Sequence, residues 1–231
     1  MNLCDKVAGK LKRHEQLIYD VPLNSLLINC RSVKKKLKSL VDNIQTNDST
    51  LAILTETWLY RNDKQVKKEL REIFDEHGLS IIRKDRNSRG GGVAIVYNSR
   101  VCELKKIQLR SLKGNSAFEI LAAVGKIRGT ERQIAVVACY VPPNYKKEEN
   151  NKFMELLSDT ISEVKTKSNG AWLTLGGDFN RRELDSVTDL FPDLNKVISP
   201  SPHKKGCYSG CVLYQLYRPY KIGNSRSPAS G

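Results

Sequence analysis

Strand-like and helix-like segments alternate along this chain, and their order constrains the fold more than any other feature. Short apolar runs of strand length are followed by segments in which apolar residues recur at helix spacing, as in residues 33–45 and 63–76. The order is strand–helix, strand–helix, several adjacent strands, helix and strand. This order predicts an α/β fold, a layered sandwich of two mixed β-sheets flanked by helices.

The predicted strands are bounded by polar or glycine-rich turns. They cover residues 23–28, 51–54, 79–82, 93–97, 101–109, 118–127, 133–140 and 171–175. The predicted helices cover residues 5–18, 33–45, 63–76 and 146–165. We therefore expect one sizeable α/β domain, which a chain of 231 residues is long enough to form.

The composition changes near residue 200. No Asp or Glu occurs after Asp193, while Pro, Ser, Gly and Tyr become frequent and only residues 211–217 resemble a strand. We predict a peripheral lead-in over 1–22, the α/β domain over 23–199, and a divergent, irregular basic tail over 200–231.

The formal net charge of +14 favours polyanionic partners such as nucleic acid, because lysine and arginine release condensed counterions when they contact phosphates. A basic surface that binds nothing is the alternative. No run of apolar residues is long enough to span a membrane, and lysines interrupt residues 1–19, so we expect neither a transmembrane segment nor a signal peptide. The lysine runs are too short to predict nuclear localisation, which would follow only from a function on DNA.

The cysteines fall into two groups. Cys30, Cys102 and Cys139 lie in apolar runs and are expected to be small buried hydrophobic residues. Cys207 and Cys211 have no further Cys or His pair at zinc-ligand spacing, so they do not predict a zinc site.

Polar residues that could carry chemistry follow the apolar strands. These residues are Asn29, Glu56, Tyr140, Asp178 and Asn180. Strand ends in α/β folds hold polar side chains at an edge that a ligand can reach. A carboxylate directly after a buried strand needs a partner such as a cation, and oxygen ligands suit a hard divalent ion.

Each of these residues also has an ordinary structural explanation. Glu56 could cap a helix or form a surface ion pair, and Asp178 in Gly-Gly-Asp-Phe-Asn could form an Asx turn. Residues 90–92, a glycine triplet, could be a flexible loop, and they lack the Lys-Ser/Thr ending and following helix of a phosphate-binding P-loop. The joint order of the polar residues is therefore more informative than any one of them.

That joint order resembles the endonuclease/exonuclease/phosphatase superfamily, specifically the apurinic-type endonuclease domains of non-LTR (LINE-type) retrotransposons. The resemblance covers roughly residues 23–199. It rests on Leu27-Ile28-Asn29-Cys30-Arg31-Ser32-Val33, Thr55-Glu56-Thr57-Trp58-Leu59, Arg83-Lys84-Asp85-Arg86 before Gly90-Gly91-Gly92, Tyr140-Val141-Pro142-Pro143-Asn144, and Gly176-Gly177-Asp178-Phe179-Asn180.

The resemblance implies a hydrolase that cleaves a DNA phosphodiester and leaves a 3′-hydroxyl to prime a downstream reverse transcriptase. Glu56 and Asn29 would hold Mg²⁺ or Mn²⁺, and Tyr140 would contact the scissile phosphate. Asp178 would orient and activate the attacking water, and Asn180 would hold the phosphate and Asp178 in register. The expected nucleic-acid contacts are Arg31, Arg83, Arg86, Arg89 and Asn144. We expect a monomer that does not bind membranes.

Two late elements of the family pattern are missing from the sequence, a Leu-Asp strand and a Ser-Asp-His segment. The histidines His14, His77 and His203 do not follow an Asp. We therefore expect the closing C-terminal strands to be absent, with exposed apolar edges, low stability and impaired or absent activity. A frameshift near residues 200–206 would explain the change of composition.

Two other functions compete with the endonuclease. A catalytically dead domain could retain only nucleic-acid binding through its basic surface. A phospholipid or inositol-phosphate hydrolase of the same superfamily is disfavoured by the context of Trp58 and Asn144 and by the lack of membrane-binding elements.

Overall fold

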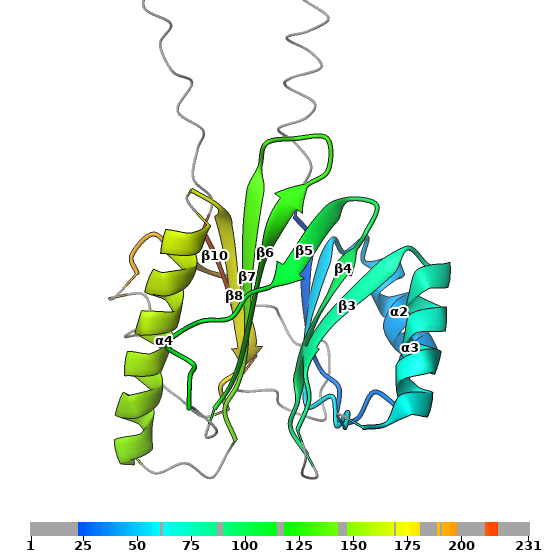
Figure 1. Cartoon of the computed structure of the whole chain (residues 1–231), viewed down its shortest axis with the longest axis horizontal. Helices are drawn as coiled ribbons and strands as arrows, with labels where there is room; N and C mark the ends of the chain where they lie inside the picture. Colours follow the sequence, from blue (N-terminus) through cyan, green and yellow to red (C-terminus); the bar gives the residue numbers. More distant parts are fainter. Residues whose placement is uncertain are drawn as a thin grey trace, which may run out of the picture.

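Two β-sheets lie face to face at the centre of the molecule, and helices cover both outer faces (Figure 1). The computed structural model describes residues 23–60, 62–86, 90–114, 118–142, 147–168, 170–180, 189, 191–197 and 211–216. The two sheets and their helices confirm the predicted α/β class and its layered arrangement.

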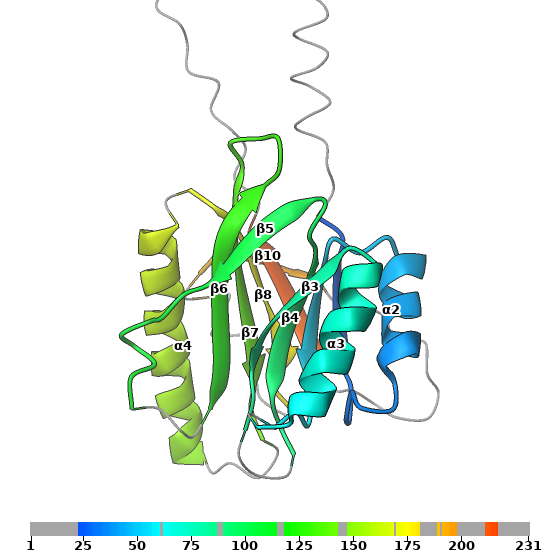
Figure 2. The same cartoon turned by 45° about the vertical axis from the view of Figure 1, so that its right-hand side comes forward.

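The smaller sheet has four strands in the order β1-β2-β4-β3. Its strands are β1 (Ser25–Asn29), β2 (Leu51–Thr55), β3 (Leu79–Lys84) and β4 (Val93–Asn98), and its helices are α2 (Leu37–Thr46) and α3 (Lys64–Glu76). Strands β1 and β2 are parallel because α2 connects them, whereas β4 runs antiparallel to β2 and β3. Figure 2 shows α2 and α3 beside each other on the outer side of this sheet.

The larger sheet has six strands in the order β5-β6-β7-β8-β10-β9. Its strands are β5 (Cys102–Lys106), β6 (Glu119–Ile127), β7 (Gln133–Tyr140), β8 (Trp172–Asp178), β9 (Asn195–Val197) and β10 (Cys211–Leu216). Helix α4 (Lys147–Lys167) connects the parallel strands β7 and β8 and covers the outer face of this sheet.

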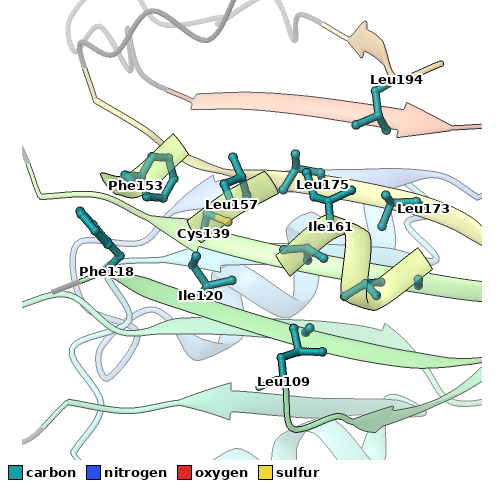
Figure 3. Close-up of a cluster of buried hydrophobic side chains, with 14 of the residues drawn as sticks. Leu109, Phe118, Ile120, Cys139, Phe153, Leu157, Ile161, Leu173, Leu175 and Leu194 are labelled. Carbon is teal, nitrogen blue, oxygen red and sulfur yellow. The ribbon is translucent and has the colours of Figure 1, made fainter. Parts of the chain in front are cut away.

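Alternation along the strands divides the core into three apolar layers, because successive side chains of a strand point to opposite faces. On β7, Val137 and Cys139 pack toward α4, whereas Val136 and Ala138 pack between the two sheets. Figure 3 shows the α4 layer, in which Phe153 lies among side chains of the sheet. The Phe153 ring is 5.1 Å from the Phe118 ring, centroid to centroid, in an edge-to-face arrangement.

Most predicted elements form close to the expected residues. The helix expected from residue 33 begins at Leu37, because residues 33–36 form a turn in which the Lys36 N–H donates to Val33 O at 2.9 Å. The strand expected over 101–109 ends at Lys106. Cys30, Cys102 and Cys139 are buried and free, as expected. None of the helices in the described ranges is long and apolar enough to cross a membrane.

One strand of the large sheet lies within the segment predicted to be an irregular tail, at residues that resemble a strand in the sequence. Strand β10 does form, and it pairs antiparallel with β8 along its length, from Cys211 opposite Asp178 to Leu216 opposite Leu173. It also pairs with β9. Backbone pairing with β10 satisfies N–H and C=O groups along this edge of β8. The lead-in over 1–22 lies outside the described residues.

Glu163 of α4 ties the helix to the segment that follows β5. Its carboxylate accepts backbone hydrogen bonds from Arg110 N at 3.0 Å and Ser111 N at 3.1 Å, and it pairs with Lys167 at 3.2 Å. The bond from the Arg110 N–H is the main cause that lowers the pKa of Glu163 to about 2, and such bonds favour the ionised carboxylate.

We expect Glu163→Gln to lower the melting temperature by a few degrees at neutral pH. Because the folded-state pKa is depressed, this contribution is fully present above the unfolded-state value of 4.5 and is lost as pH falls toward about 2. Thermal melts followed by circular dichroism, from neutral pH downward, should show the two proteins converging below the unfolded-state value. Glu155→Gln, an exposed position on the same helix, is the control and should melt like the wild type. A deficit in Glu163→Gln that does not depend on pH would contradict this account.

Candidate active site

The polar residues predicted at strand ends meet between the two sheets. Asn29 ends β1 in the small sheet, and Glu56 follows β2, whose last residue Thr55 pairs with Asn29. In the large sheet, Tyr140 ends β7 and lies opposite Asp178, the last residue of β8. Parallel strands bring equivalent ends to one edge of each sheet, and face-to-face packing brings the two edges together.

A single amide connects the two carboxylates of the site. Asn29 Nδ2 donates to Glu56 Oε1 at 3.0 Å and to Asp178 Oδ2 at 2.7 Å. Asn29 Oδ1 accepts from the Arg31 backbone N–H at 3.2 Å, which fixes the amide plane. The amide therefore places two acidic side chains from different sheets beside each other and offsets part of their repulsion.

Asp178 does form the Asx turn that was the ordinary alternative for this residue. Its Oδ1 accepts from Asn180 N at 2.9 Å, and Asn180 has a left-handed φ of 53°. Asn180 Nδ2 in turn donates to Val141 O at 2.5 Å, which ties the turn to the end of β7. The turn leaves Asp178 Oδ2 bonded to Asn29, so Asp178 can form an Asx turn and also be part of the site.

Glu56 sits on a strained backbone, with a left-handed φ of 51°. The residues on either side, Thr55 and Thr57, are fully buried, and the backbone carbonyl of Glu56 accepts from Ser32 N at 2.9 Å. Buried neighbours hold the backbone, so the Glu56 side chain projects from an anchored segment.

The glycine triplet lies against the Glu56 segment instead of forming an unattached loop. The Trp58 N–H donates to Gly91 O at 2.9 Å and the Thr57 N–H donates to Gly92 O at 3.2 Å. Gly92 has a φ of 90°, and a Cβ there would collide with the Thr57 hydroxyl. Only glycine allows this close approach without displacing Thr57.

Tyr140 is 6% exposed and lies on the inter-sheet side of β7. Burial, followed by the nearby carboxylates of Glu56 and Asp178, raises the pKa of the phenol. The hydroxyl therefore keeps its proton around neutral pH and is able to donate a hydrogen bond to an anionic group.

Glu119 is a site residue that the sequence analysis missed. It opens β6, pairs in register with Tyr140, and is 6% exposed. Its carboxylate accepts from Gly92 N and lies 3.1 Å from Arg86 Nη1. Burial raises the pKa of Glu119, and the Gly92 N–H and the cations of Arg86 and Lys84 oppose that rise. The available signal was a carboxylate at the first position of an apolar strand, whereas Glu56 was identified because it directly follows one.

The predicted arginine contacts do not all lie on one face. Leu79 and Ile81 of β3 pack toward the helices, so alternation places Arg83 on that side, where it pairs with Asp85 at 3.4 Å. Lys84 and Arg86, by contrast, share the side that faces the large sheet and both lie near Glu119.

Arg31 lies beside the site with a left-handed φ of 42°, and it is exposed. Arg89 and Asn144, two further predicted nucleic-acid contacts, lie outside the described residues. The roles of all the predicted contact residues stay predictions.

Oxygen atoms dominate the ligand set that the site offers to a cation. The carboxylates of Glu56 and Asp178 share one amide partner, and burial raises the pKa of the Cys30 thiol to about 12, which keeps this neighbouring sulfur protonated. No group of three His, Cys, Asp or Glu side chains able to hold a metal occurs within the described ranges. Carboxylate and amide oxygens are the kind of ligand that suits a hard divalent ion.

No family model matches the chain, and no curated protein matches its sequence. Solved structures do match its fold. The human Nocturnin catalytic domain, solved with a bound sulfate anion, aligns with a TM-score of 0.61 and 12% identity over 84% of this chain and 81% of that one. An AP endonuclease from Archaeoglobus fulgidus aligns with a TM-score of 0.55 and 14% identity over 84% and 87%.

The 3′ phosphatase NExo from Neisseria, solved with a product DNA hairpin, aligns with a TM-score of 0.52 and 18% identity. The alignment covers 69% of this chain and 58% of the Neisseria chain, so it spans little more than half of that protein. At these identities the similarity establishes the fold alone.

The bridging amide gives a test of the site that does not require turnover. We expect Asn29→Asp to destabilise the protein in the presence of a chelator by about 1–3 kcal/mol, because a third carboxylate replaces the donor between Glu56 and Asp178. Added Mg²⁺ should raise the melting temperature of Asn29→Asp more than that of the wild type, since only a cation can offset three acidic groups.

Differential scanning fluorimetry with and without Mg²⁺ measures both effects. Asn43→Asp, an exposed amide on α2, is the matched control and should show neither. An Asn29→Asp protein as stable as the wild type in chelator would show that the amide does not hold the carboxylates together.

Proposed function

We propose that this chain is a divalent-metal-dependent DNA endonuclease domain of a non-LTR retrotransposon, which hydrolyses a phosphodiester and leaves a 3′-hydroxyl. The observation that supports the proposal most directly is the pair of carboxylates, Glu56 and Asp178, joined by the Asn29 amide beside the protonated phenol of Tyr140. The fold, shared with an AP endonuclease and a 3′ phosphatase solved with DNA, is consistent with phosphoester chemistry.

The residues fit a Mg²⁺ or Mn²⁺ ion. Glu56 would be its principal protein ligand, with Asn29 Oδ1 beside it, and Mg²⁺ commonly binds through one or two carboxylates together with phosphate oxygens. When bound, the ion supplies charge that stabilises the phosphoryl oxygens as negative charge develops there.

The protein side chains divide the remaining tasks. Asp178 Oδ2 accepts a proton from the attacking water and aligns it, while the Asn180 N–H on Oδ1 keeps the carboxylate orientation fixed. Tyr140 donates its hydroxyl proton in a hydrogen bond to a non-bridging phosphate oxygen. Arg86 contacts the DNA backbone from the side of β3.

A protein that binds nucleic acid without cleaving it is the second candidate. The net charge of +14 supports binding by itself, and the sequence lacks the Ser-Asp-His segment of the family it resembles. In the family that the sequence resembles, the histidine of that segment stabilises the pentacovalent phosphate, so we propose that any nicking by this chain is slow.

Plasmid nicking separates the two candidates. We expect the 231-residue protein to convert supercoiled plasmid to open circles with Mg²⁺ and not with a chelator, and Asp178→Asn to reduce the rate at least ~100-fold through loss of the proton acceptor. Glu103→Gln is the control, because Glu103 is a half-exposed carboxylate in an ion pair with Lys105 on β5. It should nick at the wild-type rate.

Nicking that persists in Asp178→Asn would overturn the assignment of this residue. Salt-sensitive plasmid binding by the wild type, with no nicking above the Asp178→Asn background, would favour the binding protein over the enzyme.

A further inference from the structure

The ion pair between Glu119 and Arg86 occupies the gap between the sheets beside the carboxylate site. Glu119 is nearly buried, yet 37% of the Arg86 side chain is exposed. One end of the pair is therefore enclosed by protein while the other reaches the surface. A guanidinium has five N–H donors, so its contact with one carboxylate leaves donors for a second anion.

The glycine triplet encloses this ion pair. The Gly92 N–H donates to Glu119 Oε2, while Arg86 pairs with the other carboxylate oxygen, Oε1. A Cβ at Gly91 would lie 2.6 Å from Arg86 Cδ and 2.7 Å from Arg86 Nη1, and it would also collide with Glu119 Oε1. Glycine at position 91 therefore leaves the space that the pair fills.

A second cation, Lys84, lies near Glu119. Lys84 faces Glu119 from the end of β3, and burial lowers the pKa of its amine while Glu119 opposes that change. Arg83, the neighbouring residue in sequence, is on the opposite face of β3 with Asp85. Lys84 at the end of β3 and Arg86 just beyond it thus place two cations around the single carboxylate of Glu119.

We propose that Glu119 is a positioning residue that holds Arg86 as a backbone-phosphate contact for the nucleic acid, with Lys84 as a second contact. The inference rests on the proposed function and deepens it, because it names the residues that would locate the strand. Glu119 acts through Arg86 and does not touch the substrate. The Gly92 N–H fixes the Glu119 carboxylate, and Gly91 leaves room for the ion pair.

Whether a Glu119 substitution strengthens or weakens nucleic-acid binding distinguishes a positioning role from a general electrostatic effect. Removing a negative charge near a polyanion should strengthen binding if Glu119 only contributes to the overall field. If Glu119 positions Arg86, the same substitution should weaken binding, since the guanidinium loses the partner that fixes its direction. The measurement is the affinity of the 231-residue protein for a short fluorescent duplex, without metal, over a range of salt concentrations.

We expect Arg86→Gln to weaken binding about 10-fold and to reduce the slope of log affinity against log salt by about 1, as for the loss of one phosphate contact. Glu119→Gln should weaken binding about 5-fold with a similar loss of slope. The double variant should bind no more weakly than Arg86→Gln, because the two residues act as one unit. Lys84→Gln should lower the slope further in the Arg86→Gln background.

Glu103→Gln again serves as the matched control, since it neutralises a carboxylate of an ion pair on the same sheet. It should bind as tightly as the wild type or slightly more tightly. Gly91→Ala keeps both charges and displaces the pair, so it provides the same test if Glu119→Gln fails to fold. It should reproduce the loss of slope.

Wild-type or tighter binding by Glu119→Gln, a wild-type slope in Gly91→Ala, or additive losses in the double variant would each overturn the inference. These outcomes leave the nicking experiment unaffected, so the endonuclease proposal could stand while this inference fails. Conversely, a wild-type protein that binds DNA but does not nick it would refute the endonuclease proposal. The binding measurements on the Arg86 and Glu119 variants would still test the positioning of Arg86. A wild type with no salt-sensitive binding would refute both.

Discussion

The site depends on one side-chain amide that lies between two carboxylates. Asn29 reaches Glu56 within its own sheet and Asp178 in the other sheet, so a single group joins residues that are 149 positions apart. Without a donor between them, two carboxylates that share one partner in a partly buried site would repel each other. The amide therefore stabilises the facing sheet edges while keeping acidic oxygens available to a cation.

The precision of the site comes from the apolar layers behind it. Phe179 follows Asp178 directly and is buried, with its ring 6.0 Å from Phe153 of α4. Thr55 and Thr57 are buried on both sides of Glu56. Core residues thus hold the backbone before and after each acidic side chain, and left-handed φ values at Glu56 and Asn180 are tolerated because the surrounding packing determines them.

The residues that followed strands were predictable, because apolar runs of strand length show where a strand ends. Glu119 was overlooked because it stands at the start of its strand, and no pattern in the sequence indicates that the start of β6 lies beside the ends of β7 and β8. Arg83 and Arg86 were grouped by proximity in sequence, yet Arg83 lies on the helix side of β3 with Asp85. The strand at Cys211–Leu216 was recognised, but its partner β8 was not.

The sequence by itself determined the α/β class, the buried strands, and the positions at which polar side chains leave them, because hydrophobic periodicity and turn residues act over short distances. The tertiary structure alone decided which of these positions meet. Strand order, register and the stacking of two sheets are long-range properties. They brought Asn29 to Asp178, Glu119 to Arg86, and the glycine triplet to the Glu56 segment.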